Sequence, residues 1–107
     1  MSTIHHNKLV RDRIPEIIKG SGKTCVTRLL PQEEYLAALD AKLTEELAEY
    51  QADKSMEELA DLLEVMMAVA AARGHDFAEV EAIRRRKAEE RGGFSDRIWL
   101  ESVQAPD

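Results

Sequence analysis

Hydrophobic side chains recur at intervals of three and four residues through the centre of the chain, which is the pattern of an amphipathic helix. Between residue 31 and about residue 54 the recurring positions are Leu36, Leu39, Leu43, Leu47 and Tyr50. Glu46 follows Leu43 by three residues and therefore lies on the same stripe as the apolar side chains. The pattern predicts one long helix whose apolar face carries an acid.

Three further helices are predicted around this one. Ser55 followed by Glu58 has the spacing of a capping box, and it predicts a helix that Gly74 ends near residue 73. Asp76 and Glu79 repeat that spacing for a last helix, which ends before residue 92. A proline at position 15 suits the first turn of a short helix that ends near residues 20–22. With short extended segments near residues 23–30 and 97–100, we expect an all-α fold, an antiparallel bundle of about four helices.

The third of these helices is unusually apolar. Residues 59–72 contain only two charged side chains, Asp61 and Glu64. A helix that is apolar nearly all round is buried on most sides, and one domain of 107 residues offers it little cover. We therefore expect a single domain, residues 1–107, in which part of this helix faces a second subunit. The ends, residues 1–6 and 102–107, are expected to be mobile.

Charge and composition narrow the classes of partner. The net charge of -6 at pH 7 argues against a sequence-independent hold on a nucleic acid polymer, which needs cations that displace counterions. No apolar run approaches the roughly 20 residues of a membrane span, and the N-terminus has no apolar core of a secretory signal. The single cysteine, Cys25, excludes an internal disulfide and favours a reducing compartment. We expect a cytoplasmic protein that binds neither a nucleic acid polymer nor a membrane.

Two pairs of carboxylates at three-residue spacing form the most informative pattern. Glu46 and Glu49 project from one face of the long helix, and Glu58 and Asp61 from one face of the next. Only eight residues, 50–57, separate the pairs, so an antiparallel hairpin brings them together near one end. Several carboxylates near a core are costly unless a cation pairs with them. Mg²⁺, which prefers oxygen ligands and phosphate, suits the set, with Mn²⁺ as its expected substitute.

Some of these acids also have simpler interpretations. Glu45 and Asp53 could belong to a solvated face, and Glu58 could be only a capping residue. Asp61 is harder to explain in this way, because it lies within an apolar helix and no Lys or Arg lies within a turn of it. A charge in that setting needs a partner.

Cationic side chains form two further candidate sites. Lys87 and Arg91 continue the apolar stripe of the last helix, where they either stabilise the helix C-terminus or reach the phosphates of a nucleotide. Lys8, Arg11 and Arg13 form a second candidate set, for contacts to phosphate or base.

The sequence EELAE (residues 45–49) followed by ELAD (residues 58–61) resembles the EExxE…ExxD signature of the all-α nucleotide pyrophosphohydrolases, the MazG-like superfamily. That group includes phosphoribosyl-ATP pyrophosphohydrolases and all-α dUTPases. Its members assemble as dimers or tetramers, so the resemblance implies a homodimer or homotetramer here. NKLVRDRIPEII (residues 7–18) and KAEERGGF (residues 87–94) look like the flanks of a short subgroup of house-cleaning enzymes for noncanonical nucleotides. The three motifs cover residues 7 to about 100 and occur in the expected order.

The resemblance implies a role for each matching residue. The implied Mg²⁺ ligands are Glu46, Glu49, Glu58 and Asp61. It implies that Lys87, with Arg91, contacts the phosphates of a nucleoside triphosphate, which is hydrolysed to the monophosphate and pyrophosphate. Glu45, Glu46 or Glu49 is then expected to position or deprotonate the attacking water. The eight-residue gap between the motifs is shorter than in many larger relatives, so base specificity does not transfer.

Two alternative functions stay open at this point. One is phosphoribosyl-ATP hydrolysis in histidine biosynthesis. The other is a non-catalytic helical dimer that binds a nucleotide or a metal. Release of pyrophosphate distinguishes an enzyme from the binding module, which would show only ligand-induced stabilisation.

Overall fold

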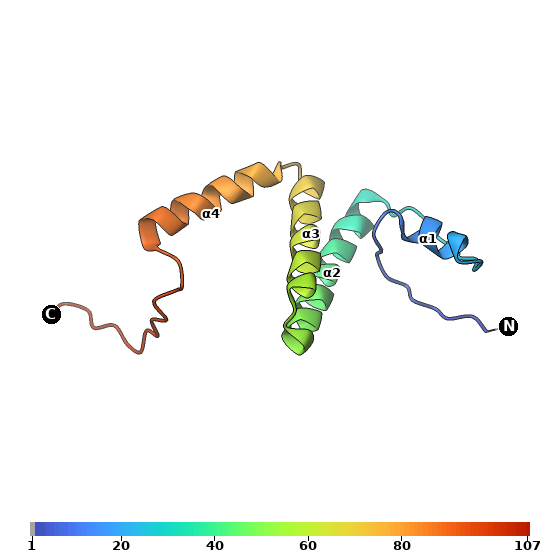
Figure 1. Ribbon diagram of the computed structural model, residues 1–107. Coiled ribbons are helices and arrows are strands. Elements are labelled where there is room, and N and C mark those ends of the chain that lie inside the picture. The colour runs from blue at the N-terminus through green and yellow to red at the C-terminus, as the bar shows by residue number, and fades with distance from the viewer. Residues whose placement is uncertain (1) are drawn as a thin grey trace. The chain divides into compact units, whose positions relative to one another are not determined.

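A computed structural model describes residues 2–107, and within them it contains four helices and no strand (Figure 1). The helices are α1 (Ile14–Gly20), α2 (Gln32–Asp53), α3 (Met56–Ala72) and α4 (Phe77–Arg91). The predicted all-α class is therefore confirmed. None of the four is both long and apolar enough to cross a membrane. The chain divides into two compact units, one that ends at His75 and one that begins at Asp76.

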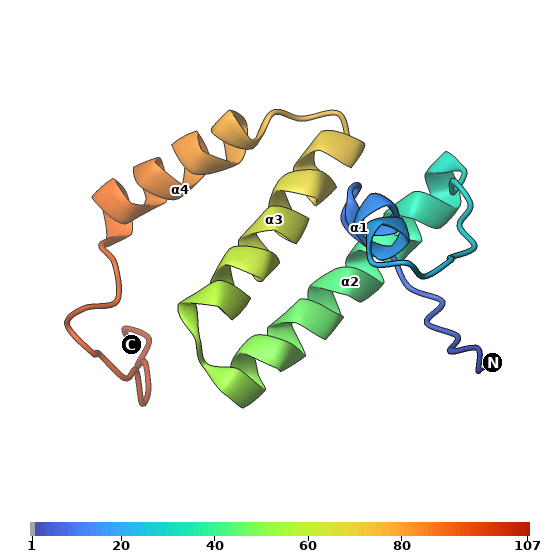
Figure 2. The same ribbon diagram turned by 45° about the vertical axis from the view of Figure 1, so that its right-hand side comes forward.

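Helices α2 and α3 form an antiparallel hairpin, and the two lie side by side in both views of the ribbon (Figures 1 and 2). At one end only Lys54 and Ser55 connect them, and Lys54 has the left-handed backbone conformation (φ 59°) that reverses the chain. At the other end the Gln32 side-chain amide donates a hydrogen bond to the carbonyl oxygen of Ala72 (3.0 Å). The predicted hairpin is thus closed at both ends.

The buried face of α2 follows the predicted stripe. Leu39 is only 3% exposed, and Leu36, Leu43 and Tyr50 are half-buried. Leu47 differs from the prediction, because it is 44% exposed. The buried face passes through positions 39, 43, 46 and 50, so an acid at position 46 takes the place that an apolar residue would normally fill.

Only one of the two apolar sides of helix α3 is covered by the rest of the chain. The side that carries Leu62, Val65 and Val69 is half-buried, and Ala70 is buried. On the other side the exposed residues are Leu59, Leu63, Met66 and Met67. The helix is therefore less buried within the chain than its composition predicts, and assembly with a second copy stays a prediction.

The predicted helix ends agree with the structure. At the start of α3 the Ser55 hydroxyl accepts a hydrogen bond from the N–H of Glu58 (3.2 Å). At the start of α4 Asp76 and Glu79 form a complete capping box. Residues 23–30 and 97–100 have no regular secondary structure, so the extended segments expected there do not form strands. Residues 2–6 and 102–107 also lack helix and strand, while Met1 lies outside the described residues.

Candidate metal centre

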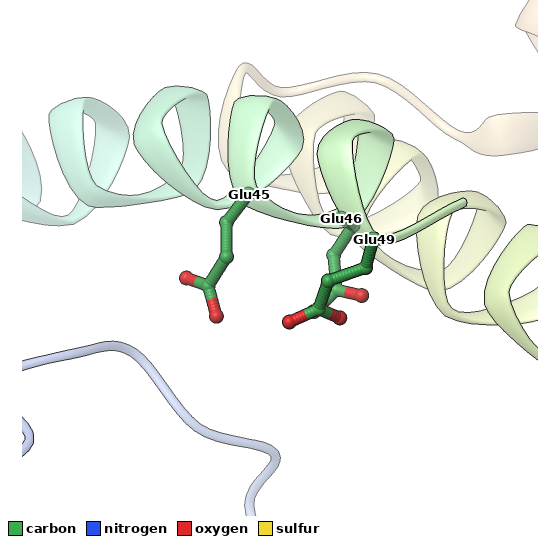
Figure 3. A group of neighbouring side chains, drawn as sticks. All are labelled: Glu45, Glu46 and Glu49. Atoms are coloured by element: carbon green, nitrogen blue, oxygen red, sulfur yellow. The ribbon is translucent and has the colours of Figure 1, made fainter. Parts of the chain in front are cut away.

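The candidate site is centred on Glu46, a charged residue that is only 7% exposed. Its position on the buried face of α2 turns its carboxylate toward α3 and away from bulk water. Oε1 of Glu46 lies 3.4 Å from the ammonium nitrogen of Lys42, whereas its Oε2 is buried and has no hydrogen-bond partner. Figure 3 shows Glu45, Glu46 and Glu49 projecting from the same side of α2. The helix therefore presents three acids together, one of them with an unsatisfied oxygen.

Helix α3 adds two carboxylates to this group. Carboxylate oxygens of Glu46, Glu58 and Asp61 all lie within 4.8 Å of one another, and so do those of Glu45, Glu46 and Glu49. Glu46 belongs to both sets and joins them across the hairpin. The structure thus brings together the four side chains that the sequence pairs, and their role as metal ligands stays a prediction. We call the five acids, Glu45, Glu46, Glu49, Glu58 and Asp61, the carboxylate cluster.

The crowding of acids changes their proton affinity. Burial raises the pKa of Glu46 above its ordinary value of 4.5, and the neighbouring Glu49 raises it further, with Lys42 acting in the opposite direction. Burial also raises the pKa of Glu58, and the negative charges of Asp61 and nearby acids add to the effect. Oε2 of Glu58, like that of Glu46, is buried without a hydrogen-bond partner. Both carboxylates therefore lack part of the compensation that a buried charge requires.

Lys42 is a resident cation of the site that the sequence analysis missed. Its ammonium nitrogen lies 3.1 Å from Oε1 of Glu45 and 3.4 Å from Oε1 of Glu46. Burial acts to lower the pKa of Lys42, but Glu45 and then Glu46 outweigh that effect and leave the pKa raised. The signal was present in the sequence, because Lys42 precedes the two acids by three and four residues on one helix face.

Asp61 has a partner that lies 50 residues away in the sequence. The guanidinium of Arg11 lies 2.8 Å from Oδ1 of Asp61 and donates a hydrogen bond to it. No Lys or Arg lies within a turn of Asp61 along α3, as the sequence indicated, but this partner comes from the segment before α1. Of the candidate set Lys8, Arg11 and Arg13, Arg11 thus contacts the carboxylate cluster, through Asp61. Lys8 is exposed, and Arg13 lies 3.8 Å from its neighbour Glu16.

The second candidate set of cations lies in the second unit. Lys87 and Arg91 are exposed on α4, as are Val80 (37%) and Ile83 (45%), so the stripe that they continue is not a buried one within that unit. Arg91 is the basic residue of the last turn, where a positive charge favours the helix C-terminus. The contact of Lys87 and Arg91 with phosphate stays a prediction.

The residues of the cluster fit a hard divalent cation. All five donors are carboxylates, two cations face them, and two of the buried oxygens have no partner. Oxygen donors of this kind are what Mg²⁺ and Mn²⁺ take. A proton on Glu46, whose pKa is raised, would also relieve part of the repulsion. The two explanations differ in their dependence on added metal, so an experiment with and without Mg²⁺ distinguishes them.

Comparison with known proteins leaves the family of this chain open. No protein-family model matches the chain, and no solved structure matches it. An uncharacterized protein of Mycolicibacterium smegmatis is 64% identical over 45 residues, which are 42% of this chain and 46% of that protein. The chain thus matches less than half the length of this curated relative.

Proposed function

We propose that the chain is a Mg²⁺-dependent nucleotide pyrophosphohydrolase with a house-cleaning role, which hydrolyses a nucleoside triphosphate to the monophosphate and pyrophosphate. The observation that carries the proposal is the carboxylate cluster, in which acids from α2 and α3 meet around the buried Glu46. The resemblance of EELAE and ELAD to the signature of the MazG-like superfamily supports the substrate class. The proposed cation ligands are Glu46, Glu49, Glu58 and Asp61.

The proposed reaction assigns distinct tasks to the residues of the cluster. A bound Mg²⁺ would offset the negative charge of the triphosphate. Glu45 and Glu49 are more exposed than Glu46, so they are better placed to accept the proton of the attacking water. The P–O bond between the α- and β-phosphoryl groups breaks, and pyrophosphate leaves. Lys87 and Arg91 are proposed to contact the phosphate oxygens.

The experiment that tests this function is a substrate panel assayed for pyrophosphate. The purified protein is incubated with canonical and modified nucleoside triphosphates and with phosphoribosyl-ATP, each with Mg²⁺ and with EDTA. We expect Mg²⁺-dependent pyrophosphate release from at least one nucleoside triphosphate. Activity on phosphoribosyl-ATP alone would favour the histidine-biosynthesis alternative.

The panel also distinguishes an enzyme from a binding module. A non-catalytic module would gain thermal stability from a nucleotide with Mg²⁺, because ligand binding stabilises the folded state, yet it would release no pyrophosphate. Stabilisation by Mg²⁺-nucleotide without product from any member of the panel would therefore contradict the proposed activity.

A further inference from the structure

The ion pair between Arg11 and Asp61 joins two distant parts of the first unit. Arg11 lies in the segment that precedes α1, where there is no regular secondary structure, and Asp61 lies in the second turn of α3. Their side chains are 57% and 44% exposed, and their nitrogen and oxygen atoms are 2.8 Å apart. Within residues 2–107 this is the one ion pair of Arg11. The pair is therefore well formed but open to water.

If the cluster binds a divalent cation, that cation and the guanidinium of Arg11 compete for Asp61. The guanidinium and the cation are both attracted by the negative charge of one carboxylate, and their like charges repel each other at that distance. An exposed ion pair is weak, because water screens it and two side chains lose freedom to form it. A doubly charged ion held by several carboxylates has the advantage in that competition. Arg11 would then lose its partner as the site fills.

Lys42 differs from Arg11 in this respect. It is 16% exposed, and it contacts Glu45 and Glu46 from within the same helix. If Lys42 lost its contacts with these carboxylates, its ammonium group would be buried without a partner, which costs free energy. Of the two resident cations, Arg11 is the one that can leave at little cost.

We propose that Arg11 is a built-in competitor of the divalent cation: it holds Asp61 while the site has no cation, and it is released when a cation binds. The inference rests on the proposed cation site. It gives the segment before α1 a role, since its guanidinium is freed beside the site when the site becomes ready for a triphosphate. A planar guanidinium suits the phosphate oxygens that would arrive there.

The first test measures Mg²⁺ affinity by isothermal titration calorimetry in three proteins. These are the wild type, Arg11→Ala and Arg13→Ala. The control removes an equal charge from the same segment but touches only the local pair with Glu16. Removal of the competitor should tighten Mg²⁺ binding by roughly two- to fivefold, which is the range of an exposed ion pair. The Arg13→Ala protein should bind Mg²⁺ as the wild type does.

The second test follows the release of Arg11 in the wild-type protein. Trypsin cleaves after an arginine only when the guanidinium can enter the specificity pocket of the protease. Cleavage after Arg11, followed by mass spectrometry, should therefore become faster when Mg²⁺ is added. Cleavage after Arg28 is the internal control, because its partner Glu34 lies outside the carboxylate cluster.

The outcomes separate this inference from the function on which it rests. Mg²⁺ binding to the wild type, with unchanged or weaker binding to Arg11→Ala, would overturn the competition and leave the cation site in place. Slower or unchanged cleavage after Arg11 in Mg²⁺, relative to Arg28, would overturn it without any variant. Absence of Mg²⁺ binding to the wild type would overturn both proposals together.

Discussion

Acids of the same type behave in opposite ways in the α2–α3 hairpin and on α4. On α4, Oε1 of Glu81 lies 2.6 Å from the guanidinium of Arg84 and 3.6 Å from that of Arg85, and the hydrogen bond from Arg84 holds the pKa of Glu81 below its ordinary value. In the hairpin, burial and neighbouring acids raise the pKa of Glu46 and Glu58. On α4 opposite charges are paired, whereas in the hairpin several negative charges lie close together.

The difference between α4 and the hairpin indicates which acids need a further partner. Glu81 finds its cations three and four residues along the same exposed helix, so its charge is satisfied locally. The carboxylate cluster draws its members from two helices, and its two resident cations do not reach Oε2 of Glu46 or Glu58. Such an arrangement lowers the stability of the fold, and a further cation that pairs with the unsatisfied oxygens can remove this penalty.

The largest expected effect is on turnover. Replacing Asp61 with Asn should lower Mg²⁺-dependent pyrophosphate release by roughly 100-fold or more, the scale of losing one preorganised charged group. The matched control is Asp40→Asn, which changes an exposed aspartate of α2 that pairs with Arg73 outside the cluster. We expect the control to keep turnover, and both proteins to keep the helical circular dichroism of the wild type. Wild-type turnover by the Asp61→Asn protein would contradict the site.

The helices and the convergence of the acids were predictable because they depend on local rules. Helix ends follow from caps and glycines within a few residues, and the short gap between the two acidic motifs forces them to meet across the hairpin. Lys42 was also within reach of such a rule, since it precedes Glu45 and Glu46 on one helix face. The pairing of Arg11 with Asp61 was not, because no local spacing relates residues that lie 50 positions apart.

The exposure of Leu47 has a different cause. Hydrophobic periodicity alone assigns it to the buried stripe, because leucine occurs there at the expected interval. The structure instead buries Glu46, one residue earlier, and leaves Leu47 44% exposed. The periodicity also placed Glu46 on this stripe, but an apolar stripe about 100° wide does not decide which of two adjacent positions is the more deeply buried.

The next effect is on stability, and it compares the two regions directly. Glu46→Gln removes a buried charge and should raise the melting temperature of the metal-free protein by about 2–5 °C. It should also abolish any stabilisation by Mg²⁺. Glu81→Gln removes a well-paired exposed acid, so it should lower the melting temperature slightly and leave the effect of Mg²⁺ intact. Differential scanning fluorimetry of the wild type and both variants, in EDTA and in Mg²⁺, measures these shifts, and an equal response of the two variants would refute the distinction.

The pH dependence of stability should differ in sign between the two regions. A carboxylate whose folded pKa is raised adds stability below the ordinary value of 4.5, and this stability is lost as the pH rises through the raised pKa. Glu46 and Glu58 should therefore make the metal-free protein more stable at pH 5 than at pH 7. Glu81, whose pKa is lowered, acts only as the pH falls below 4.5.

Urea unfolding in EDTA at the two pH values measures this effect. The gain at pH 5 should shrink in Glu46→Gln, because one of the titrating groups is gone, and it should persist in Glu81→Gln. Saturating Mg²⁺ should also reduce the gain, since the cation holds the acids in their charged form. Two results would contradict the assignment. One is a wild-type protein that is less stable at pH 5 than at pH 7, and the other is an equal gain at pH 5 in Glu46→Gln and Glu81→Gln.

The remaining expected effects concern the helix caps. Ser55→Ala and Asp76→Ala each remove a side chain that accepts a hydrogen bond at a helix start, and each should cost about 1 kcal/mol in urea unfolding. Only Ser55 holds the turn that carries Glu58, so only Ser55→Ala should also weaken Mg²⁺ binding. An equal loss of Mg²⁺ affinity in both variants would show that the cap acts on overall stability alone.

The central claim is that the carboxylate cluster is a divalent cation site, and calorimetric titration of Mg²⁺ tests it most directly. The wild type and Glu81→Gln are expected to show the same saturable binding at one site per chain, and Glu46→Gln is expected to lose it. Equal binding curves for all three proteins, or no saturable binding to the wild type, would contradict the account.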